Sequence, residues 1–493
     1  MGKRIAALPT LLLAVSMSLS GVAVAQQSLR VDLQLEPPHL DPTRTPSATT
    51  AETVHRNVFQ GLTRIDRHGE VRPGLAERWR VSEDGLRYRF WLRKGVRFHD
   101  GRRFDAEVAA YSLRRLLSED AGNPQRQLYR AIREVEVAGS HELVLHLSQP
   151  NSLLPFRLGL SAAVMVHPDS VHTNVTRPVG TGPYAFQGWE RGSGVRLAAF
   201  ADYWGQAPAI ERATFTFTGN RLELEGGLAE GLIDLYPDAS SLTSHMALSL
   251  RADYRIKDGF SEGEVILAIN HARPPFDDRR VRRALSHAVD REALLDIYPA
   301  ISPPLIGSHF SPRHPAYVDL VDRYPHDPQR ARELLAEAGQ AEGSSLTLTV
   351  PPTQYAESAS LYIAADLEAV GIEVTLERLD WPEWLAQVFN EHDYDLTIVA
   401  HVEPMDIDIY ARDDYYFNYQ DADFKALWKR IEAAQEASAR HALLGEAQRH
   451  LADEAVNVFL FLKPQQAIHK VGLTGVWSDT PIPAVVLQEL AWE

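Results

Sequence analysis

Several short stretches in the first half of the chain alternate apolar and polar residues. Tyr88, Phe90 and Leu92 alternate with Arg87, Arg89 and Arg93, and the same period of two recurs on both sides of a turn within 135–147. This period is typical of strands with one buried face, and the turn between two of them predicts a hairpin. Between these strands, the stretch 105–117 is expected to be a helix.

The second half of the chain repeats its apolar residues at helical spacing. From Val281 to Val289 they recur every three or four positions, which predicts a helix with one apolar face. Asp327 is a suitable cap and Pro328 suits the first position of the helix that follows. Its apolar residues lie within 331–338, and Gly339 is expected to end it.

A strand, a helix and a second strand follow in order. We expect a strand at 346–350, a helix from about 357 to 370, and a strand at 372–376. This order predicts a right-handed crossover between two parallel strands.

The rest of the chain continues in the same manner. A helix is expected near Trp384, strands at 396–399 and 458–462, and one charged helix from 424 to about 451. The sequence therefore predicts an α/β fold in this half.

The segment 179–184 contains two glycines on either side of Thr181. It lacks the lysine and the following helix that a phosphate-binding loop needs, so we interpret it as a structural turn. Gly180 and Gly182 are expected to supply backbone angles that other residues resist.

Length and charge limit the classes of protein that are possible. The 493 residues are too many for one compact core and indicate two or three domains. The formal charge of −16 argues against a nucleic-acid partner and against docking on anionic lipid. With no cysteine in the chain, disulfides, thiolate metal ligands and a lipid-modified cysteine are excluded.

The N-terminus has the pattern of a secretory signal peptide over residues 1–25. Lys3 and Arg4 precede an apolar stretch, and Ala23-Val24-Ala25 matches a cleavage site, which would place the mature start at Gln26. The alternative is a membrane anchor, but the stretch is short and interrupted by serines. We expect an exported protein in the periplasm, neither lipid-anchored nor embedded in the membrane.

Nine ordered stretches together are similar to one known family. They are Leu40-Asp41-Pro42, 61–76, 96–101, 180–184, 202–204, Asn270 with 275–278, 281–286, the helix after Asp327-Pro328, and 368–372. Their order resembles the oligopeptide/dipeptide/nickel class of solute-binding proteins, family 5, which serve ABC importers. The resemblance covers nearly the whole mature chain.

The resemblance implies a two-lobed, type II-like periplasmic-binding-protein fold with an additional, mostly-β inserted domain. Two crossovers would join the α/β lobes, which close over the ligand. The expected division is lobe I at 26–57, 177–268 and 465–493, inserted domain II at 58–176, and lobe III at 269–464.

The resemblance also points to a ligand-binding loop at 400–408, directly after the strand at 396–399. In the peptide-binding members this loop carries an aspartate that holds the ligand's α-amino group. Here His401 stands near the usual aromatic position, and Glu403 and Asp406 flank the expected acid. Either acid is a candidate partner for a ligand ammonium; the alternative is that both cap the loop or face solvent.

Further ligand-binding candidates lie around this loop. Tyr415 and Tyr416 suit a partly apolar ligand or a cation over a ring, although core packing is equally open. Arg412 suits a ligand carboxylate, or is neutralised by its acidic neighbours. Trp381 occupies a segment that lines the pocket in family members, and 43–49 touches ligand in some of them.

The function implied is capture of an oligopeptide-like or amino-acid-derived solute for an inner-membrane ABC permease. A non-peptide solute such as an opine, a nickel chelate or a sugar remains open, with clustered acids favouring a cation. A hydrolase is disfavoured because no nucleophile elbow and no H-E-x-x-H motif occurs. We expect no catalytic residues, no cofactor, no resident metal and a monomer.

Overall fold

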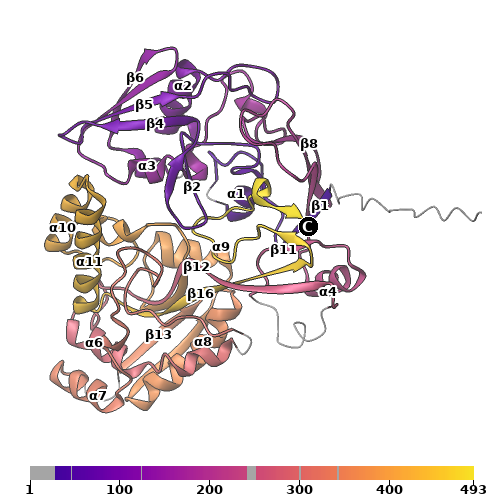
Figure 1. Ribbon diagram of the computed structural model, residues 1–493. Coiled ribbons are helices and arrows are strands. Elements are labelled where there is room, and N and C mark those ends of the chain that lie inside the picture. Colours follow the sequence, from indigo (N-terminus) through magenta and orange to yellow (C-terminus); the bar gives the residue numbers. More distant parts are fainter. Residues whose placement is uncertain (1–27, 46, 124, 241–250, 299–300, 341–343) are drawn as a thin grey trace, which may run out of the picture.

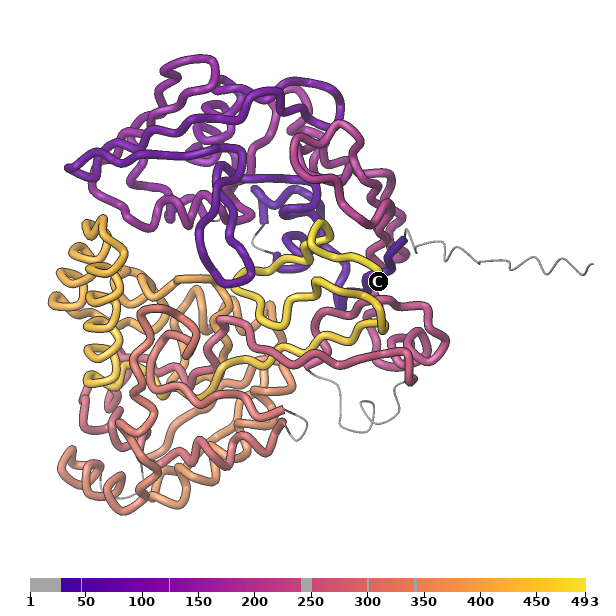
Figure 2. Tube along the Cα trace, in the orientation of Figure 1, coloured from indigo at the N-terminus to yellow at the C-terminus, as the bar shows by residue number. Residues whose placement is uncertain are grey.

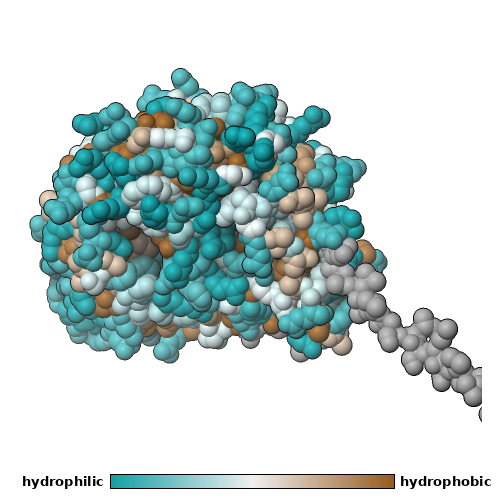
Figure 3. All heavy atoms as spheres, turned by 45° about the horizontal axis from the view of Figure 1, so that its top comes forward, coloured by the Kyte–Doolittle hydropathy of each residue, from teal (hydrophilic) through white to brown (hydrophobic). Residues whose placement is uncertain are grey.

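The computed structural model describes residues 28–45, 47–123, 125–240, 251–298, 301–340 and 344–493. The expected signal peptide at 1–25 lies outside these residues. Among the helices described, none is both long and apolar enough to span a bilayer. The face drawn in Figure 3 is largely hydrophilic, with apolar residues scattered over it.

One large sheet contains ten strands, which come from both the N-terminal and the C-terminal parts of the described chain (Figure 1). Its strands are β1 (Ser28–Leu33), β8 (Tyr184–Glu190), β9 (Gly194–Ala199), β10 (Arg212–Phe217), β11 (Leu235–Tyr236), β12 (Tyr254–Ile269), β13 (Ser344–Val350), β14 (Ile372–Arg378), β15 (Leu396–His401) and β16 (Asn457–Lys470). Their order is β14-β13-β15-β12-β16-β11-β1-β10-β9-β8. We call β14, β13 and β15 the β14 end, and β11, β1, β10, β9 and β8 the β8 end.

Two long antiparallel strands, β12 and β16, join the two ends. The first part of β12 pairs with β16 beside β11, and its last part, from Glu264 to Ile269, pairs with β15. The register of β12 against β16 shifts between Phe260 and Glu264. Such an irregularity bends a strand locally, and it lies where the sheet passes from one end to the other.

Helices cover both faces of the β14 end. They are α6 (Arg279–Ala288), α7 (Pro328–Glu337), α8 (Gln354–Ala369), α9 (Trp381–Trp384), α10 (Ala422–Ala433) and α11 (Ala437–Glu454). Val265 and Leu267 of β12 point into the core with α6, α7 and α8, whereas Ile266 and Ala268 point into the core with α10 and α11. Period-two alternation of one strand thus supplies two cores.

The predicted parallel pair is confirmed, because β13 and β14 pair in parallel and α8 lies between them in the sequence. The prediction of one helix from 424 to about 451 is wrong, because α10 stops at Ala433 and α11 starts at Ala437. A straight helix of that length would span about 40 Å. Phe424 and Leu451 are instead buried in the same core, which requires the chain to turn back.

A separate four-stranded sheet lies toward the N-terminus. Its order is β4 (Ala76–Val81), β5 (Arg87–Leu92), β7 (Glu142–Leu147) and β6 (Ile132–Gly139). The predicted hairpin β6–β7 is confirmed, and Tyr88, Phe90 and Leu92 are buried on one face of β5. The helices α2 (Ala106–Leu117) and α3 (Leu154–Arg157) belong to this four-stranded unit, whose core is its own.

The remaining elements are short. They are α1 (Ala48–Val54), α4 (Arg221–Glu230), β2 (Thr63–Ile65), β3 (Val71–Pro73), β17 (Leu473–Thr474) and β18 (Ala491–Trp492). The C-terminal segment returns beside the start of the chain (Figure 2), where the side-chain amide of Asn57 donates to the Val485 carbonyl at 2.7 Å.

The turn at Gly180 and Gly182 is present, but the expected reason for its glycines is wrong. Neither residue is among those with positive φ. A Cβ at Gly180 would instead overlap the carbonyl oxygen of Val58, and one at Gly182 that of Asn57. Glycine is needed here for close backbone approach.

The four-stranded unit also contacts α10. The Ser152 amide donates to the Glu432 carbonyl at 2.8 Å, and the Arg157 guanidinium lies 3.6 Å from the Glu432 carboxylate. The side chains of Arg157 and Glu432 are nearly buried. We call this contact the α10 clasp.

Candidate functional site

Polar and aromatic side chains gather where three parallel strands end. The carboxyl ends of β13, β14 and β15 lie at one edge of the sheet, and β12 reaches this edge from the β8 end, with Glu264 opposite His401. Open α/β sheets place ligands at such carboxyl edges. The edge therefore frames the candidate site.

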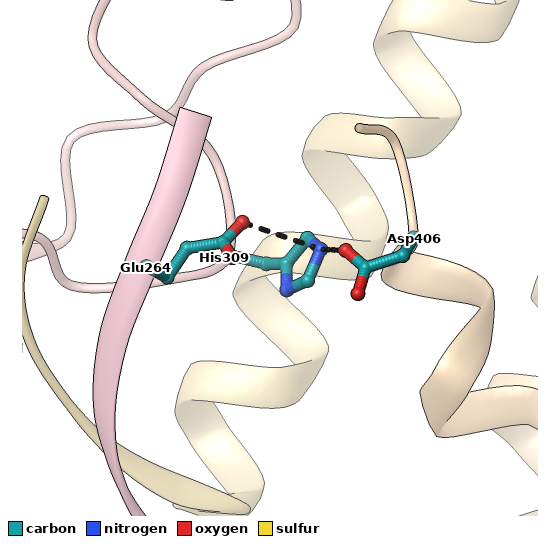
Figure 4. A group of neighbouring side chains, drawn as sticks. All are labelled: Glu264, His309 and Asp406. Carbon is teal, nitrogen blue, oxygen red and sulfur yellow. Dashed lines mark hydrogen bonds and ion pairs between the residues drawn. The ribbon is translucent and has the colours of Figure 1, made fainter. Parts of the chain in front are cut away.

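A buried ionic cluster lies at this edge (Figure 4). His309 Nε2 is 2.9 Å from Asp406 Oδ1 and 3.4 Å from Glu264 Oε1. Glu264 comes from β12, Asp406 from the loop after β15, and His309 from the segment between α6 and α7. None of the three residues exceeds 7% exposure.

The pKa values of the two carboxylates in this cluster are shifted in opposite directions. Burial on its own raises the pKa of Asp406, but His309 and His401 outweigh it and hold the pKa well below its usual range. Burial and the nearby Asp406 raise the pKa of Glu264 well above its usual value. Glu264 Oε2 is buried and has no hydrogen-bond partner.

His401 and Tyr416 support Asp406 from the other side. His401 Nδ1 lies 3.5 Å from Asp406 Oδ2, and His401 Nε2 lies 2.9 Å from the Tyr416 hydroxyl. Tyr416 is buried and stacks on the His401 ring, while Tyr415 is half-buried with its hydroxyl 3.4 Å from His401 Nδ1. The structure thus brings four of the predicted residues together, namely His401, Asp406, Tyr415 and Tyr416.

Three other predicted residues lie around this cluster. Glu403 is exposed, although a carboxylate oxygen of it lies within 4.8 Å of ligand atoms of His401 and Asp406. Arg412 pairs with Asp408 at 3.2 Å and lies over the Tyr415 ring. Trp381 is 40% exposed at the start of α9, directly after β14.

Trp381 belongs to an apolar surface. Leu385 and Phe389, in the π-helical turns that continue α9, are also exposed, and Phe389 contacts the Tyr415 ring at 6.0 Å between centroids. We call Trp381, Leu385 and Phe389 the apolar strip. An exposed strip beside a carboxyl-edge site can accept apolar ligand groups.

A second charged group lies at the passage of β16 between the two ends of the sheet. Lys463 Nζ is 3.1 Å from Asp238 Oδ2, and both interact electrostatically with Glu52 of α1. Burial and then Asp238 raise the pKa of Glu52 to about 7, although Lys463 opposes them. We call Glu52, Asp238 and Lys463 the crossing triad.

The two charged groups are close along the sheet. The Ser261 hydroxyl donates to the Lys463 carbonyl at 3.2 Å, three residues before Glu264. The Ala400 amide at the end of β15 donates to the Tyr355 hydroxyl at 2.9 Å, and Tyr355 interacts with Lys463. The crossing triad therefore borders the same edge as the buried cluster.

Sequence analysis missed Glu264, His309 and the crossing triad. Lys463 carried a usable signal, because it is the cation that directly follows the apolar run 458–462, and Glu264 is the acid that precedes the apolar run 265–269. His309 lies in a stretch without periodicity and carried no signal.

The fold and the carboxyl edge together define a class of protein. Two ends of one sheet meet at a carboxyl edge that carries charges of both signs and exposed aromatic residues. This is the arrangement of a two-part receptor that holds a small solute between its parts.

Comparison with known proteins assigns the family. The model of the bacterial extracellular solute-binding proteins, family 5 Middle, matches residues 70–423. The chain belongs to this family, as its resemblance predicted.

Individual relatives support the assignment. The glutathione-binding protein GsiB of Salmonella choleraesuis (strain SC-B67) is 31% identical over 352 residues, 69% of this chain and 67% of the relative. Di/tripeptide-binding protein 2 of Pseudomonas aeruginosa (strain UCBPP-PA14) is 31% identical over 432 residues, 78% of each chain.

A solved structure supports the fold. The ABC transporter substrate binding protein CtaP of Listeria monocytogenes has a TM-score of 0.83 at 21% identity, covering 95% of this chain and 99% of that chain. The predicted solute-binding fold is confirmed.

Proposed function

We propose that this protein is the periplasmic substrate-binding component of an ABC importer and captures a short peptide or peptide-like solute. Its membership of family 5 and its similarity to relatives named as glutathione-binding and di/tripeptide-binding support this class of solute. Its partner would be an inner-membrane permease. Its task would be binding and delivery, without chemical change to the solute.

The crossing triad is the observation that carries the peptide proposal. A short peptide bears an ammonium and a carboxylate, and a buried ligand charge needs an opposite charge. Glu52 and Asp238 offer negative charge and Lys463 offers positive charge at one place. We assign the solute's ammonium to Glu52 and its carboxylate to Lys463, whose ammonium has three donors and can pair with a second carboxylate beside Asp238.

The sequence predicts that Asp406 or Glu403 binds the ammonium of the solute, and this role stays a prediction. Our assignment favours Glu52 instead. The Asp406 carboxylate already faces His309 and His401, so the protein itself supplies the positive charge there. Glu403 is exposed and keeps its hydration in the free protein. Glu52 is therefore the better candidate.

The apolar strip fits the side chains of such a solute. Trp381, Leu385 and Phe389 are exposed next to Tyr415, and burying them against apolar groups of a solute would be favourable. The three expected parts would then close over the solute, with lobes I and III hinging at β12 and β16 and domain II held at the α10 clasp.

The loop 400–408 favours one alternative, a non-peptide solute such as an opine or a chelate. The loop departs from the peptide-binding pattern at His401, which stands near the usual aromatic position and contacts Asp406. In that case the solute would lack a free α-ammonium.

Binding of matched peptides tests the proposal. The mature protein is titrated calorimetrically with a tripeptide, its N-acetylated form and its C-terminal amide, while liquid chromatography checks that the peptide stays intact. We expect binding of the free peptide and losses of about tenfold or more with each block, because each removes a charged partner. Equal binding of all three would contradict the crossing-triad assignment, and hydrolysis would contradict the receptor class.

A further inference from the structure

We propose that Glu264, His309 and Asp406 form a binding site for a divalent cation of the zinc class. The site would be separate from the solute contacts assigned above. It would join three segments that are far apart in the sequence.

The donor atoms have the separations that a tetrahedral ion needs. Zinc binds histidine nitrogen and carboxylate oxygen at about 2.0–2.2 Å, so neighbouring ligand atoms of a tetrahedral site lie about 3.4 Å apart. His309 Nε2 lies 2.9 Å from Asp406 Oδ1 and 3.4 Å from Glu264 Oε1, and one ligand atom from each residue falls within 4.8 Å of the others. Small side-chain shifts would admit the ion.

The charge of the cluster calls for a cation. Two carboxylates share a site in which Glu264 is 4% and Asp406 7% exposed, and both nearby histidines, His309 and His401, lie closest to Asp406. Glu264 Oε2 is buried and has no hydrogen-bond partner. A buried polar atom without a partner requires an explanation, and a bound cation supplies one.

The types of donor select the class of ion. One imidazole and two carboxylates suit zinc, manganese or another first-row ion, and the absence of cysteine disfavours ions that prefer thiolate. A site with three protein ligands leaves a fourth position, which water or His401 Nδ1 would fill.

Further contacts fix the orientation of the proposed metal ligand Asp406. Asp406 presents Oδ1 to His309 while its Oδ2 faces His401, and the other nitrogen of His401 is 2.9 Å from the Tyr416 hydroxyl. Such outer contacts fix ligand carboxylates in metal sites. The exposed residues Val402 and Glu403 flank the cluster and offer the path of entry.

Glu264 lies at the irregularity where β12 passes between the two ends of the sheet. A cation there would fasten β12 to the loop after β15 and to the segment of His309. The expected effect is stabilisation of the β14 end beside the hinge, without contact with the solute.

The test uses the mature protein freed of metal with a chelator and then dialysed. Zn²⁺ alone is titrated calorimetrically, bound zinc is counted by mass spectrometry, and Co²⁺ is added separately to record its visible spectrum. The variants are Glu264→Gln and His309→Gln. The control is Glu373→Gln, an exposed acid at the amino end of β14, opposite the carboxyl edge.

We expect one zinc per chain, a higher melting temperature with Zn²⁺, and a tetrahedral Co²⁺ spectrum. Each cluster variant should weaken zinc binding at least tenfold, and Glu373→Gln should bind as the parent does. If a variant does not fold, the Co²⁺ spectrum of the parent decides alone. No zinc bound by the parent, an octahedral Co²⁺ spectrum, or full binding by both variants would overturn the proposal, whatever the outcome of the peptide titrations.

Discussion

The partner of a carboxylate decides what that carboxylate can do, as Asp406 and Glu52 show. Asp406 lies between two histidines of its own chain, which keep it ionised while it is buried. Glu52 has a neighbouring acid and a lysine already paired to that acid, and its pKa rises to about 7. An acid in this second condition gains most from a cation that arrives from outside.

Replacing Glu52 by Gln should therefore separate stability from binding. Folding raises the Glu52 pKa, so its ionisation costs stability as pH rises from about 4.5 to about 7. Above pH 7, Glu52→Gln should raise the free energy of unfolding by about 1–3 kcal/mol, with little effect near pH 4.5. Urea unfolding at both pH values measures this, with exposed Glu230→Gln as control.

The same variant should bind the free tripeptide more weakly. Loss of the charged contact should cost about tenfold to hundredfold in affinity at pH 8, and the affinity of the parent should rise with pH as Glu52 ionises. Calorimetry at pH 5.5 and 8 measures both. If the affinity of the parent decreases from pH 5.5 to pH 8, the assigned role of Glu52 is contradicted.

At the scale of single residues, sequence predicted the loop but not what the loop meets. The residues of 400–408 follow a strand, and this position together with the resemblance to family 5 selected Asp406. The contact with His309 depends on a long, irregular connection between α6 and α7, and no local pattern encodes where such a connection passes.

Elements were predictable wherever their ends carry their own signals. The helix α7 begins after Asp327, whose carboxylate accepts from the Arg330 amide at 2.9 Å, and Gly339 follows its end with φ of 79°. Both signals are local. The break between α10 and α11 has none: Ala434 ends α10 in extended geometry without glycine or proline, because the shared core requires the turn.

The turn at 180–182 gives a prediction at this scale. Gly180→Ala should lower the free energy of unfolding by about 3 kcal/mol or more, because the added Cβ would overlap the Val58 carbonyl and the backbone must move. Gly226→Ala is the control, since nothing lies within 4 Å of its Cβ position inside α4, and there alanine should stabilise by about 0.5–1 kcal/mol. Thermal and urea unfolding measure both.

At the scale of the whole molecule, the α10 clasp and the two crossing strands hold the parts together. In Figure 1, the clasp at α10 and the β8 end lie on opposite sides of the β14 end. Sequence gave no indication of it, because Ser152 and Glu432 belong to segments hundreds of residues apart.

Weakening the clasp should lower solute affinity without touching the solute. Glu432→Gln removes the ion pair with Arg157, so a smaller fraction of the protein would occupy the closed form that binds. We expect a loss of about threefold to tenfold by calorimetry. Glu446→Gln, which breaks the exposed pair with Arg430, is the control and should bind normally.

Closure itself can be measured directly because the chain has no cysteine. Spin labels at Arg133→Cys, in the four-stranded unit, and Glu368→Cys, in α8, are both on exposed positions. Their separation should shorten when the tripeptide is added. A distance distribution that does not respond to the bound peptide would contradict hinge closure.

The crossing strands β12 and β16, where we propose the hinge, have a consequence for proteolysis. These strands remain hydrogen-bonded to each other on both sides of the irregularity at Phe260 and Glu264. A protease must pull several residues into an extended, unpaired form, and here it would first have to separate a ladder in the middle of the sheet. Proteolytic cleavage should therefore begin at surface loops rather than in β12 or β16. The cleaved fragments should stay associated, because the strands of the proposed hinge are among the hardest segments to cut.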